Sequence, residues 1–471
     1  MSKMWSGRFR EPLDPAFEAW QRSFPFDWRL LPQEIAASKA HARMIAAAGI
    51  LTEAELTTML DGLDRVISTA EEESKLTNLI ALNPNAEDIH HFVELTLTKI
   101  IGDLALKLHT GRSRNEQIAT DMRLFVREAI DTTLRGLHEW RGALVKLATD
   151  AGEAVMPSYT HLQRAEPVLV AHWLLAYVSM IERDSSRLSD CRRRMNLCPL
   201  GSGAVAGATL ALDRTIAASA LGFDAPTPNS MDATSDRDFA LEFTQALSTL
   251  GIHISRFAEE LTLYSTAEFG FVDLPEAFST GSSAMPQKKN PDLTELIRGK
   301  SGRLLGSAIT LTTLMKGLPL AYNKDLQEGQ EPVFDAADTI EGILRVLPAF
   351  TRALRFRFDR MCIASQTGYL NAMAAATYLT QKGVPFRKAH EKIGNAVRLG
   401  LETGRELQEL TLDELRGFGP EFAEDFFAAV TLEATLDCHD VIGGTARGRV
   451  GAALEDARRR IASESEDNLR N

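Results

Sequence analysis

Four long segments in which apolar residues recur every three or four positions restrict the fold of this chain more than any other feature. They run from Ser113 to about Asp150, from Glu166 to about Leu197, from Ser235 to about Thr266 and from Pro291 to about Lys316. Each would span about 35 Å or more as a helix. No segment alternates apolar and polar residues long enough to predict a real sheet. The sequence therefore predicts an all-α chain with a long helical bundle.

Shorter helices are expected on both sides of this bundle. The segment from Leu31 to Ala48 is predicted to be a helix that Gly49 ends, and Thr52 with Glu55 forms a capping box for the next one. After about Arg360 the helical segments shorten again. We therefore expect three helical domains: residues 1–110 as an N-terminal domain, 111–360 as the central long-helix bundle and oligomerisation domain, and 361–471 as a C-terminal domain.

Two of the long segments bear on how the bundle is covered. The segment that starts at Pro291 has one apolar face, formed by Leu293, Leu296, Ile297, Leu304, Ala308, Leu311 and Leu314. The stretch from Trp173 to Met180 is apolar on more than one side, so one neighbouring helix of the same chain would not cover it. Bundles that associate between chains would cover it. A large monomeric core is the alternative, and periodicity alone leaves both open.

Composition excludes several classes of partner. The formal net charge of −12 disfavours nucleic acids and anionic membranes, because both bind basic surfaces. No apolar run approaches the roughly 20 residues of a membrane span, and the start MSKMWSGRFR lacks the apolar core of a signal peptide. We expect a soluble, cytoplasmic protein that binds an anionic substrate through a local cationic pocket.

The cysteines and the acidic residues give no sign of a metal site. Cys191 and Cys198 fall about 10 Å apart along one predicted helix, too far for a disulfide. Neither they nor Cys362 and Cys438 have the spacing of a zinc site, so reduced thiols are expected. Glu87-x-x-His90 has the spacing of a di-iron ligand pair, but the chain contains no second copy. We therefore expect neither metal nor cofactor.

The stretch GSSAMPQKKNP, from Gly281 to Pro291, gathers hydroxyl, ammonium and amide groups directly before a helix. Asn290 is predicted to be the N-cap and Pro291 the first helical residue. The positive end of a helix stabilises anions, and Lys288 adds a full charge. This pattern indicates an anion-binding catalytic loop for a carboxylate or a carbanion-derived oxyanion. A mobile, lysine-rich surface loop is the alternative, which the Gly-Ser-Ser-x-Met-Pro run disfavours.

This loop resembles the signature of the fumarase and aspartase superfamily, whose members cleave C–N or C–O bonds and release fumarate or a close relative. Gln287-Lys288-Lys289 resembles the argininosuccinate lyase version, whereas fumarases and aspartases usually carry Gly-Lys-Val and adenylosuccinate lyases His-Lys-Arg. Six further segments resemble argininosuccinate lyases: MWSGRF at 4–9, EDIH at 87–90, TGRSRNEQ at 110–117, YTHLQRAEP at 159–167, SDRDFALE at 235–242 and AYNKDLQE at 321–328.

The resemblance implies a homotetramer with a shared central bundle that splits argininosuccinate into arginine and fumarate, in arginine biosynthesis, by anti elimination through an aci-carboxylate intermediate. Because the matched motifs lie far apart along rod-like helices, each active site is expected to draw on more than one subunit. Two alternatives stay open: another fumarate-releasing lyase, and a non-catalytic relative like the eye-lens crystallins of this family. The joint presence of Ser282, Lys288, Asn290 and His161 favours activity.

The resemblance also implies catalytic roles. Ser282 would be the base, and Lys288 with Asn290 would stabilise the charge that develops on the carboxylate. Lowering a hydroxyl pKa by six units takes roughly 8 kcal/mol, so the loop must close over the substrate and exclude water. His161, beside Thr160 and oriented by Glu295, would help to protonate the leaving nitrogen. Glu295 could equally be a carboxylate that complements the helix dipole.

A second set of residues is expected to bind the substrate. Cations at a helix start are disfavoured by the helix dipole, so the arginines of TGRSRNEQ indicate an external anion. Matching to the family assigns substrate contacts to Ser23, Asp27, His90, Arg114, Asn115, Arg237, Tyr322, Lys324 and Gln327. For Arg112 and Gln163 an ordinary structural role is equally well supported. The glycine-rich stretch from Pro199 to Thr209 lacks nucleotide-loop spacing, so we interpret it as a tight loop or a close backbone approach.

Overall fold

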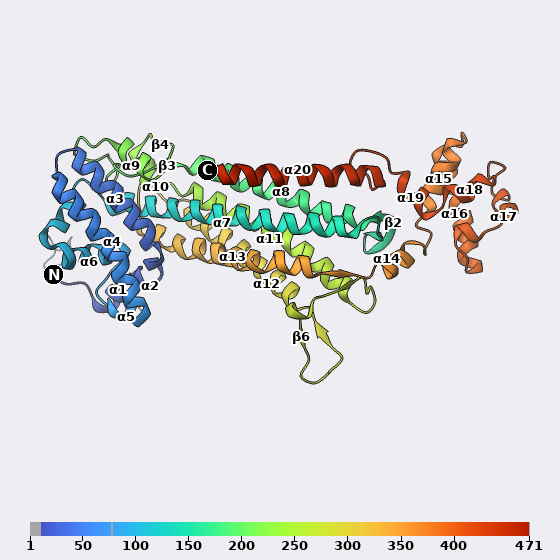
Figure 1. The fold of residues 1–471 in the computed structure, drawn as a ribbon, viewed down its shortest axis with the longest axis horizontal. Helices are drawn as coiled ribbons and strands as arrows, with labels where there is room; N and C mark the ends of the chain where they lie inside the picture. Colours follow the sequence, from blue (N-terminus) through green and yellow to red (C-terminus); the bar gives the residue numbers. More distant parts are fainter. Residues whose placement is uncertain (1–10, 77–78, 471) are drawn as a thin grey trace. The chain divides into compact units, whose positions relative to one another are not determined.

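The computed structural model describes residues 11–76 and 79–470 of the chain. The MWSGRF segment at 4–9 therefore lies outside the described residues. Helices dominate, as predicted, and strands are short (Figure 1). Within the described ranges, no helix combines the length and the apolar character needed to cross a membrane.

The four predicted long helices are present. They are α7 (Arg114–Ala151), α8 (Val170–Met195), α11 (Asp238–Ser265) and α12 (Asp292–Met315). Three more helices reach 24 residues and were not predicted to be long, namely α4 (Glu53–Leu76), α13 (Gln330–Ala353) and α20 (Arg447–Arg470). The sequence pattern could have predicted a long α13, since Val333, Ile340 and Leu347 recur at helical spacing and are all buried.

A hairpin corrects the prediction that the second long helix begins within YTHLQRAEP. Strand β1 (Val155–Thr160) pairs antiparallel with β2 (Gln163–Leu169). His161 and Leu162 form the turn with φ of 55° and 57°, the left-handed conformation that a tight two-residue hairpin turn requires. Pro167 has no amide hydrogen and disfavours helical backbone at the residue before it, so α8 starts only after this strand.

Every other strand in the described residues is two residues long. β3 (Leu197–Cys198) pairs with β4 (Ala225–Pro226), β5 (Val272–Asp273) with β8 (Arg355–Phe356), and β6 (Thr280–Gly281) with β7 (Lys289–Asn290). Because Cys198 lies in β3 beyond the end of α8, the prediction that it shares a helix with Cys191 was wrong. All four cysteines are free, as expected.

The chain divides into two compact units, each built from three separate segments. Unit 1 comprises Met1–Thr132, Arg187–Ser248 and Arg303–Thr339, and unit 2 comprises Thr133–Ser186, Thr249–Gly302 and Ile340–Asn471. Each unit therefore combines stretches that are distant in sequence. The division into three consecutive domains rests on helix lengths alone and stays a prediction.

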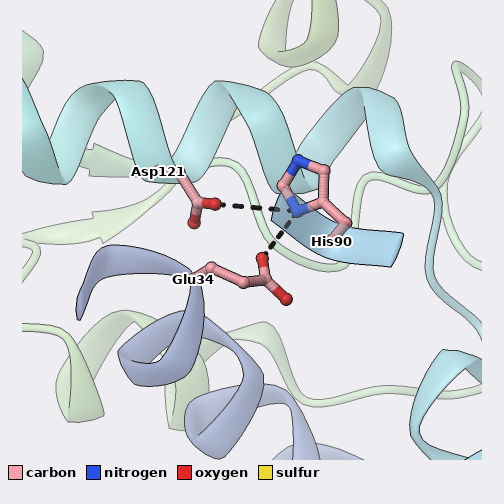
Figure 2. A group of neighbouring side chains, drawn as sticks. All are labelled: Glu34, His90 and Asp121. Atoms are coloured by element: carbon pink, nitrogen blue, oxygen red, sulfur yellow. Dashed lines mark hydrogen bonds and ion pairs between the residues drawn. The ribbon is translucent and has the colours of Figure 1, made fainter. Parts of the chain in front are cut away.

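Unit 1 is a small helical assembly in which α3 packs against α4, α6 and α9. The predicted capping box at the start of α4 is confirmed, because Thr52 N donates to Glu55 Oε2 at 2.9 Å and Glu55 N donates to Thr52 Oγ1 at 3.2 Å. This packing brings Glu34, His90 and Asp121 into one buried group (Figure 2). The shorter helices are α1 (Pro15–Trp20), α2 (Phe24–Asp27), α3 (Leu31–Ala47), α5 (Leu79–Leu82), α6 (Ile89–Ile101), α9 (Arg214–Ala220) and α10 (Ser230–Ser235), with 3-10 turns at Trp28–Leu30, Gly102–His109 and Lys324–Gly329.

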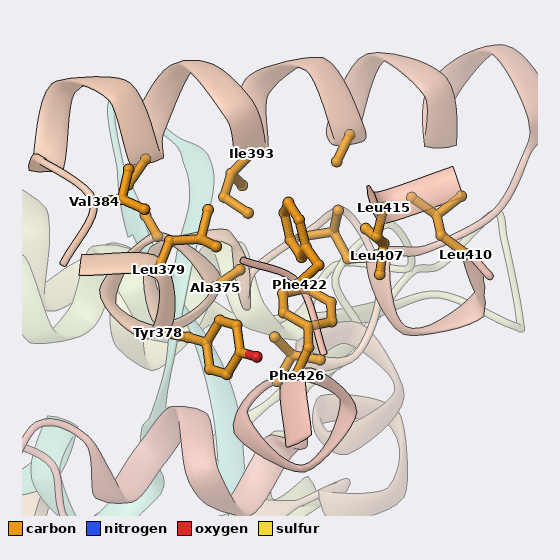
Figure 3. Packing of buried hydrophobic residues seen from close by; sticks show 14 residues of the cluster. Ala375, Tyr378, Leu379, Val384, Ile393, Leu407, Leu410, Leu415, Phe422 and Phe426 are labelled. Atoms are coloured by element: carbon orange, nitrogen blue, oxygen red, sulfur yellow. The ribbon is translucent and has the colours of Figure 1, made fainter. Parts of the chain in front are cut away.

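Unit 2 contains a well-packed apolar core near the C-terminus (Figure 3). Leu379, Leu407, Leu415, Phe422 and Phe426 are fully buried there, and the rings of Phe422 and Phe426 meet edge to face at 5.1 Å. Its shorter helices are α14 (Phe358–Ser365), α15 (Ala372–Gln381), α16 (Phe386–Thr403), α17 (Leu412–Arg416), α18 (Asp425–Ala429) and α19 (Leu432–Asp437), with 3-10 turns at Glu276–Phe278 and Leu407–Glu409.

One face of α12 stays exposed although it carries large apolar side chains. Leu296, Leu305 and Ile309 are 59, 49 and 57% exposed, whereas Ile297 and Leu304 are buried. Leu296, which was predicted to share one apolar face with Ile297 and Leu304, is therefore exposed in the single chain, whereas those two residues are buried. Gly299, Gly302 and Gly306 also lie on this helix. Small and apolar residues together form a surface suited to close helix packing.

We predict that Phe426→Ala destabilises unit 2 by about 3–5 kcal/mol, because it removes a fully buried ring and leaves a cavity. The matched control is Phe386→Ala on α16, whose ring is half exposed. Urea denaturation measures both variants. Equal midpoints for the two would contradict the packing described here.

Candidate active site

Six predicted substrate-binding residues line one pocket of about 800 Å³ in unit 1. Its size is typical of a site for a small molecule. The predicted lining residues are Ser23, Arg114, Asn115, Tyr322, Lys324 and Gln327. Glu87, Asp88, Arg112 and the loop from Gly203 to Thr209 also line it. The sequence had predicted a tight loop or a close backbone approach for this stretch, without assigning it to a site.

Backbone geometry explains why the lining loop is rich in glycine. Gly201, Gly203 and Gly207 adopt φ of 87°, 61° and 93°, in the region that favours glycine. A Cβ atom at Gly203 would lie 2.8 Å from the Gly207 carbonyl oxygen, which is too close. Gly203 N donates to Glu116 Oε2 at 2.9 Å, and Asn115 Nδ2 donates to the Ala204 carbonyl oxygen at 3.1 Å. The start of α7 therefore holds the loop against the pocket.

Asp27 anchors the short helix α2 beside the pocket. Ser23 Oγ donates to Asp27 Oδ2 at 2.6 Å, and the Ile89 amide donates to Asp27 Oδ1 at 3.0 Å. Burial, reinforced by the neighbouring Asp88 carboxylate, raises the pKa of Asp27 to about 7. Ser23 and Asp27 thus lie together, as predicted, and Asp27 is a carboxyl group that titrates near neutral pH.

Asp88 is a pocket residue that sequence reasoning passed over, although it belongs to the quoted EDIH motif. It caps α6 by accepting from His91 N at 2.7 Å, and it forms an ion pair with Arg114, the first residue of α7. Burial alone would raise its pKa, but the charges of Arg114 and His90 keep the pKa of Asp88 below its ordinary value. Arg114 at this helix start therefore already has one carboxylate partner within the chain.

The remaining predicted binding residues lie in or beside the same pocket. His90 is buried and accompanies Asp88 at the start of α6. Arg237 is buried near Tyr322, and its Nη2 has no hydrogen-bond partner among the described residues. Burial lowers the pKa of Arg237 to about 10, and an anionic ligand would satisfy the unpaired donor. Lys324 Nζ lies 4.0 Å from Glu87 Oε1.

The predicted catalytic residues lie in unit 2. Thr160 and His161 are exposed at the end of the hairpin, and His161 lines a second cavity of about 570 Å³. Aromatic side chains form much of this cavity, including Tyr159, Tyr264 and Phe269. Gln163 and Arg164 line another cavity nearby, where Arg164 Nη1 donates to Thr367 Oγ1 at 2.9 Å.

The loop 281–291 is held at its base by the β6–β7 pair (Figure 1). Ser282 Oγ accepts hydrogen bonds from Ala284 N at 3.3 Å and Met285 N at 3.1 Å. Lys289 Nζ donates to Asp273 Oδ1 at 2.5 Å, whereas Lys288 is exposed and forms no ion pair with any described residue. The serine hydroxyl and one lysine are thus available on this loop.

The predicted start of α12 is wrong by one residue. Asn290 lies in β7, and the Pro291 carbonyl accepts the first helical hydrogen bond, from Glu295 N at 3.1 Å. Pro291 therefore occupies the N-cap position. Glu295 is exposed, and its Oε1 lies 4.0 Å from Arg298 Nη2. No hydrogen bond among the described residues joins Glu295 to His161. Orientation of His161 by Glu295 stays a prediction.

Comparison with known proteins decides the family. A family model described as a lyase matches residues 7–306, and one described as argininosuccinate lyase C-terminal matches residues 369–437. An argininosuccinate lyase of Acidobacterium capsulatum is 65% identical over 459 residues, which cover 97% of this chain and 94% of the relative. The chain belongs to the argininosuccinate lyase family. The resemblance drawn from its motifs is confirmed.

Other relatives of this argininosuccinate lyase family member agree. An argininosuccinate lyase of Koribacter versatilis is 56% identical over 459 residues, which cover 98% of this chain and 97% of the relative. Among solved structures, EDDS lyase in complex with formate superposes with a TM-score of 0.82 at 26% identity, over 93% of this chain and 87% of that chain. The fold is therefore shared well beyond close relatives.

Asp27 should make the stability of this argininosuccinate lyase family member depend on pH. Its folded pKa lies above the unfolded value of 3.8, so the folded state binds more protons between the two values. Stability contributed by this group is then lost as pH rises toward 7. We predict that the melting temperature of Asp27→Asn minus that of the wild type becomes more positive from pH 5 to pH 8.

Differential scanning fluorimetry across that pH range measures the difference. Asp61→Asn on the exposed surface of α4 is the control and should show a flat difference. A flat difference for Asp27→Asn as well would contradict the raised pKa.

Proposed function

We propose that this chain cleaves argininosuccinate to arginine and fumarate, as a carbon–nitrogen lyase of arginine biosynthesis. The observation that carries the proposal is 65% identity, over nearly the whole chain, to a protein named argininosuccinate lyase. The chain carries the segments GSSAMPQKKNP and YTHLQRAEP, which resemble motifs of this family. The four cysteines are unpaired, which suits a reducing cytoplasm, and we propose that location.

The proposed mechanism is an anti elimination that passes through an aci-carboxylate. Ser282 removes the proton next to a carboxylate, whose added charge Lys288 and Asn290 stabilise. In the present conformation two backbone amides donate to Ser282 Oγ, an arrangement that favours negative charge on this oxygen. His161, with Thr160 beside it, assists proton transfer to the leaving nitrogen. Breaking the C–N bond then releases fumarate and arginine.

Substrate binding is assigned to the unit 1 pocket. We propose that Arg114, Asn115 and Lys324 bind the carboxylates of argininosuccinate, since they present donors to the same cavity. The unpaired donor of Arg237 supplies a further anion contact. Ser23 and Asp27, with the neighbouring Tyr322 and Gln327, would hold the guanidinium end, for which a carboxyl group and hydrogen-bond acceptors are suited.

We propose further that the active enzyme is a homotetramer whose sites combine residues of several subunits. The predicted residues fall into two sets, the binding set in unit 1 and the catalytic set with Asn290 in unit 2. His161 and Glu295 are both exposed and are not bonded to each other within one chain. The exposed apolar and glycine-containing face of α12 offers a surface for helices of other subunits.

The proposed activity is tested by following fumarate absorbance in parallel with argininosuccinate, adenylosuccinate, malate and aspartate. We predict fumarate release from argininosuccinate alone, because the loop carries Gln287-Lys288-Lys289. Release from another substrate would reassign the chain to a different lyase reaction. A folded oligomer that is inactive on all four would support a structural role like that of the crystallins.

Shared sites predict complementation between inactive variants. His161→Asn and Lys288→Ala should each lower turnover by about 10²-fold or more, since each removes a proposed catalytic group. If His161 and Lys288 reach one site from different chains, oligomers reassembled from a mixture of the two should recover part of the activity, because some sites then receive both wild-type residues. His390→Asn, an exposed histidine on α16, is the control for His161→Asn. Mixed oligomers that stay inactive would argue for sites built within one chain.

A further inference from the structure

Three side chains from different helices form a buried ionisable group behind the unit 1 pocket (Figure 2). Glu34 comes from α3, His90 from the start of α6 and Asp121 from α7. Their exposed fractions are 1, 4 and 0%. No motif in the sequence pointed to Glu34 or Asp121, and the proposed mechanism does not use them.

Glu34 is a carboxylate with both oxygens occupied by donors. His90 Nδ1 lies 2.8 Å from Glu34 Oε2, and Ser38 Oγ donates to Glu34 Oε1 at 2.7 Å. Gln117 Nε2 donates to the two oxygens at 3.2 and 3.4 Å. Burial opposes the charge, but His90 and Arg112 together with these hydrogen bonds lower the pKa of Glu34 to about 2. An ionised Glu34 can only accept, so His90 Nδ1 carries a proton and donates it.

Asp121 completes the group as a second buried carboxyl group. Its Oδ2 lies 3.8 Å from His90 Nδ1, and neither of its oxygens has a hydrogen-bond partner in the described structure. Burial and the nearby Glu34 carboxylate raise the pKa of Asp121 well above its usual range. Ionisation of Glu34, directly against the His90 ring, is therefore favoured over ionisation of Asp121.

This arrangement suits a proton better than a metal ion. The three side chains lie close enough to share a cation, but a metal ligand must direct a lone pair at the ion. Glu34 directs its lone pairs at Ser38, Gln117 and His90. His90 Nδ1 is protonated, so it has no lone pair to offer a metal.

The second ring nitrogen of His90, Nε2, is free to donate to a ligand. Nε2 makes no hydrogen bond with any described residue. His90 lies two residues after Asp88, which lines the pocket and whose charge acts on the imidazole, as does that of Arg114. Burial alone would lower the pKa of His90, but Glu34 and Asp88 raise it above its ordinary value. His90 is thus suited to carry a positive charge with Nε2–H as its free donor.

We propose that Glu34 is a positioning residue for the reaction: by accepting from Nδ1 it fixes the ring of His90 and presents Nε2–H to a carboxylate of the substrate. This inference rests on the proposed function and adds to it a residue of α3, a helix that does not line the pocket. Glu34 itself does not touch the substrate.

The decisive readout is the pH dependence of kcat/KM, which reports ionisations of the free enzyme. If His90 must be protonated, activity falls as pH rises through its pKa. Glu34→Gln removes the adjacent negative charge, so this alkaline limb should move to lower pH by about one unit or more. At pH 8, kcat/KM should fall roughly 10- to 100-fold. The titratable and charged groups around His90 are Glu34, Asp27, Asp88, His109, Arg112, Arg114 and Asp121.

Three further variants separate positioning from a structural effect. Asp121→Asn replaces a carboxyl group whose neutral form burial favours with a neutral amide, and it should leave the alkaline limb in place. Asp184→Asn removes a buried carboxylate in unit 2 whose Oδ2 lies 2.7 Å from His253 Nδ1. This variant should lower the melting temperature without moving the alkaline limb of the pH profile. In a His90→Gln background, Glu34→Gln should cause no additional loss of kcat/KM. The melting temperature of every variant shows whether it is folded.

An unchanged alkaline limb in folded Glu34→Gln would overturn the inference, and so would an additive loss in the double variant. Wild-type protein that releases no fumarate from argininosuccinate would instead overturn the proposed function, and the inference with it. If Glu34→Gln fails to fold, a Glu34→Asp variant, whose shorter side chain draws the carboxylate away from His90 Nδ1, should show a smaller shift in the same direction. No shift there would also count against Glu34.

Discussion

The pairing of buried charges where α6 and α7 begin is the constraint on which the candidate site depends. Asp88 caps α6 and pairs with Arg114 at the first residue of α7, so a cation stands where the helix dipole alone would disfavour it. The same region packs Asp27 against the Ile89 amide and His90 against Glu34. Uncompensated charges would be costly there, so each partner fixes the position of the other. The result is a set of paired charges beside the pocket.

The two units carry complementary chemistry. Unit 1 supplies donors and a carboxyl group around a preformed pocket, which suits recognition of a substrate with several charges. Unit 2 supplies the hairpin with His161 and the exposed loop with Ser282 and Lys288, which suits proton transfer and stabilisation of a developing charge. In the proposed mechanism the first set binds the substrate and the second set carries out the elimination. The division of the predicted residues between two units, together with the exposed apolar face of α12, is the physical reason to propose sites assembled from several chains.

The sequence predicted the long helices because apolar spacing of three or four residues, sustained over many turns, fits a helix and does not fit a strand. It missed the hairpin because short strands give little alternation, and because His161 and Leu162 occupy turn positions where glycine or asparagine is usual. The predicted binding residues could be found from the sequence because most of them lie in motifs that resemble those of the family. Glu34 and Asp121 were not, since a single acidic residue within a helix gives no sign that three helices will bury it. The role of the loop from Gly203 to Thr209 likewise depends on packing against α7, which is not local in sequence.

The crystal structure of Ser282→Ala with argininosuccinate bound would test the central claim most directly. Without the proposed base the substrate should persist, as a molecule held by Arg114 and Lys324 of one chain. The account predicts that His161 and the loop 281–291 at that same molecule belong to other chains of the oligomer. A substrate enclosed entirely by residues of a single chain, or bound away from the unit 1 pocket, would contradict it.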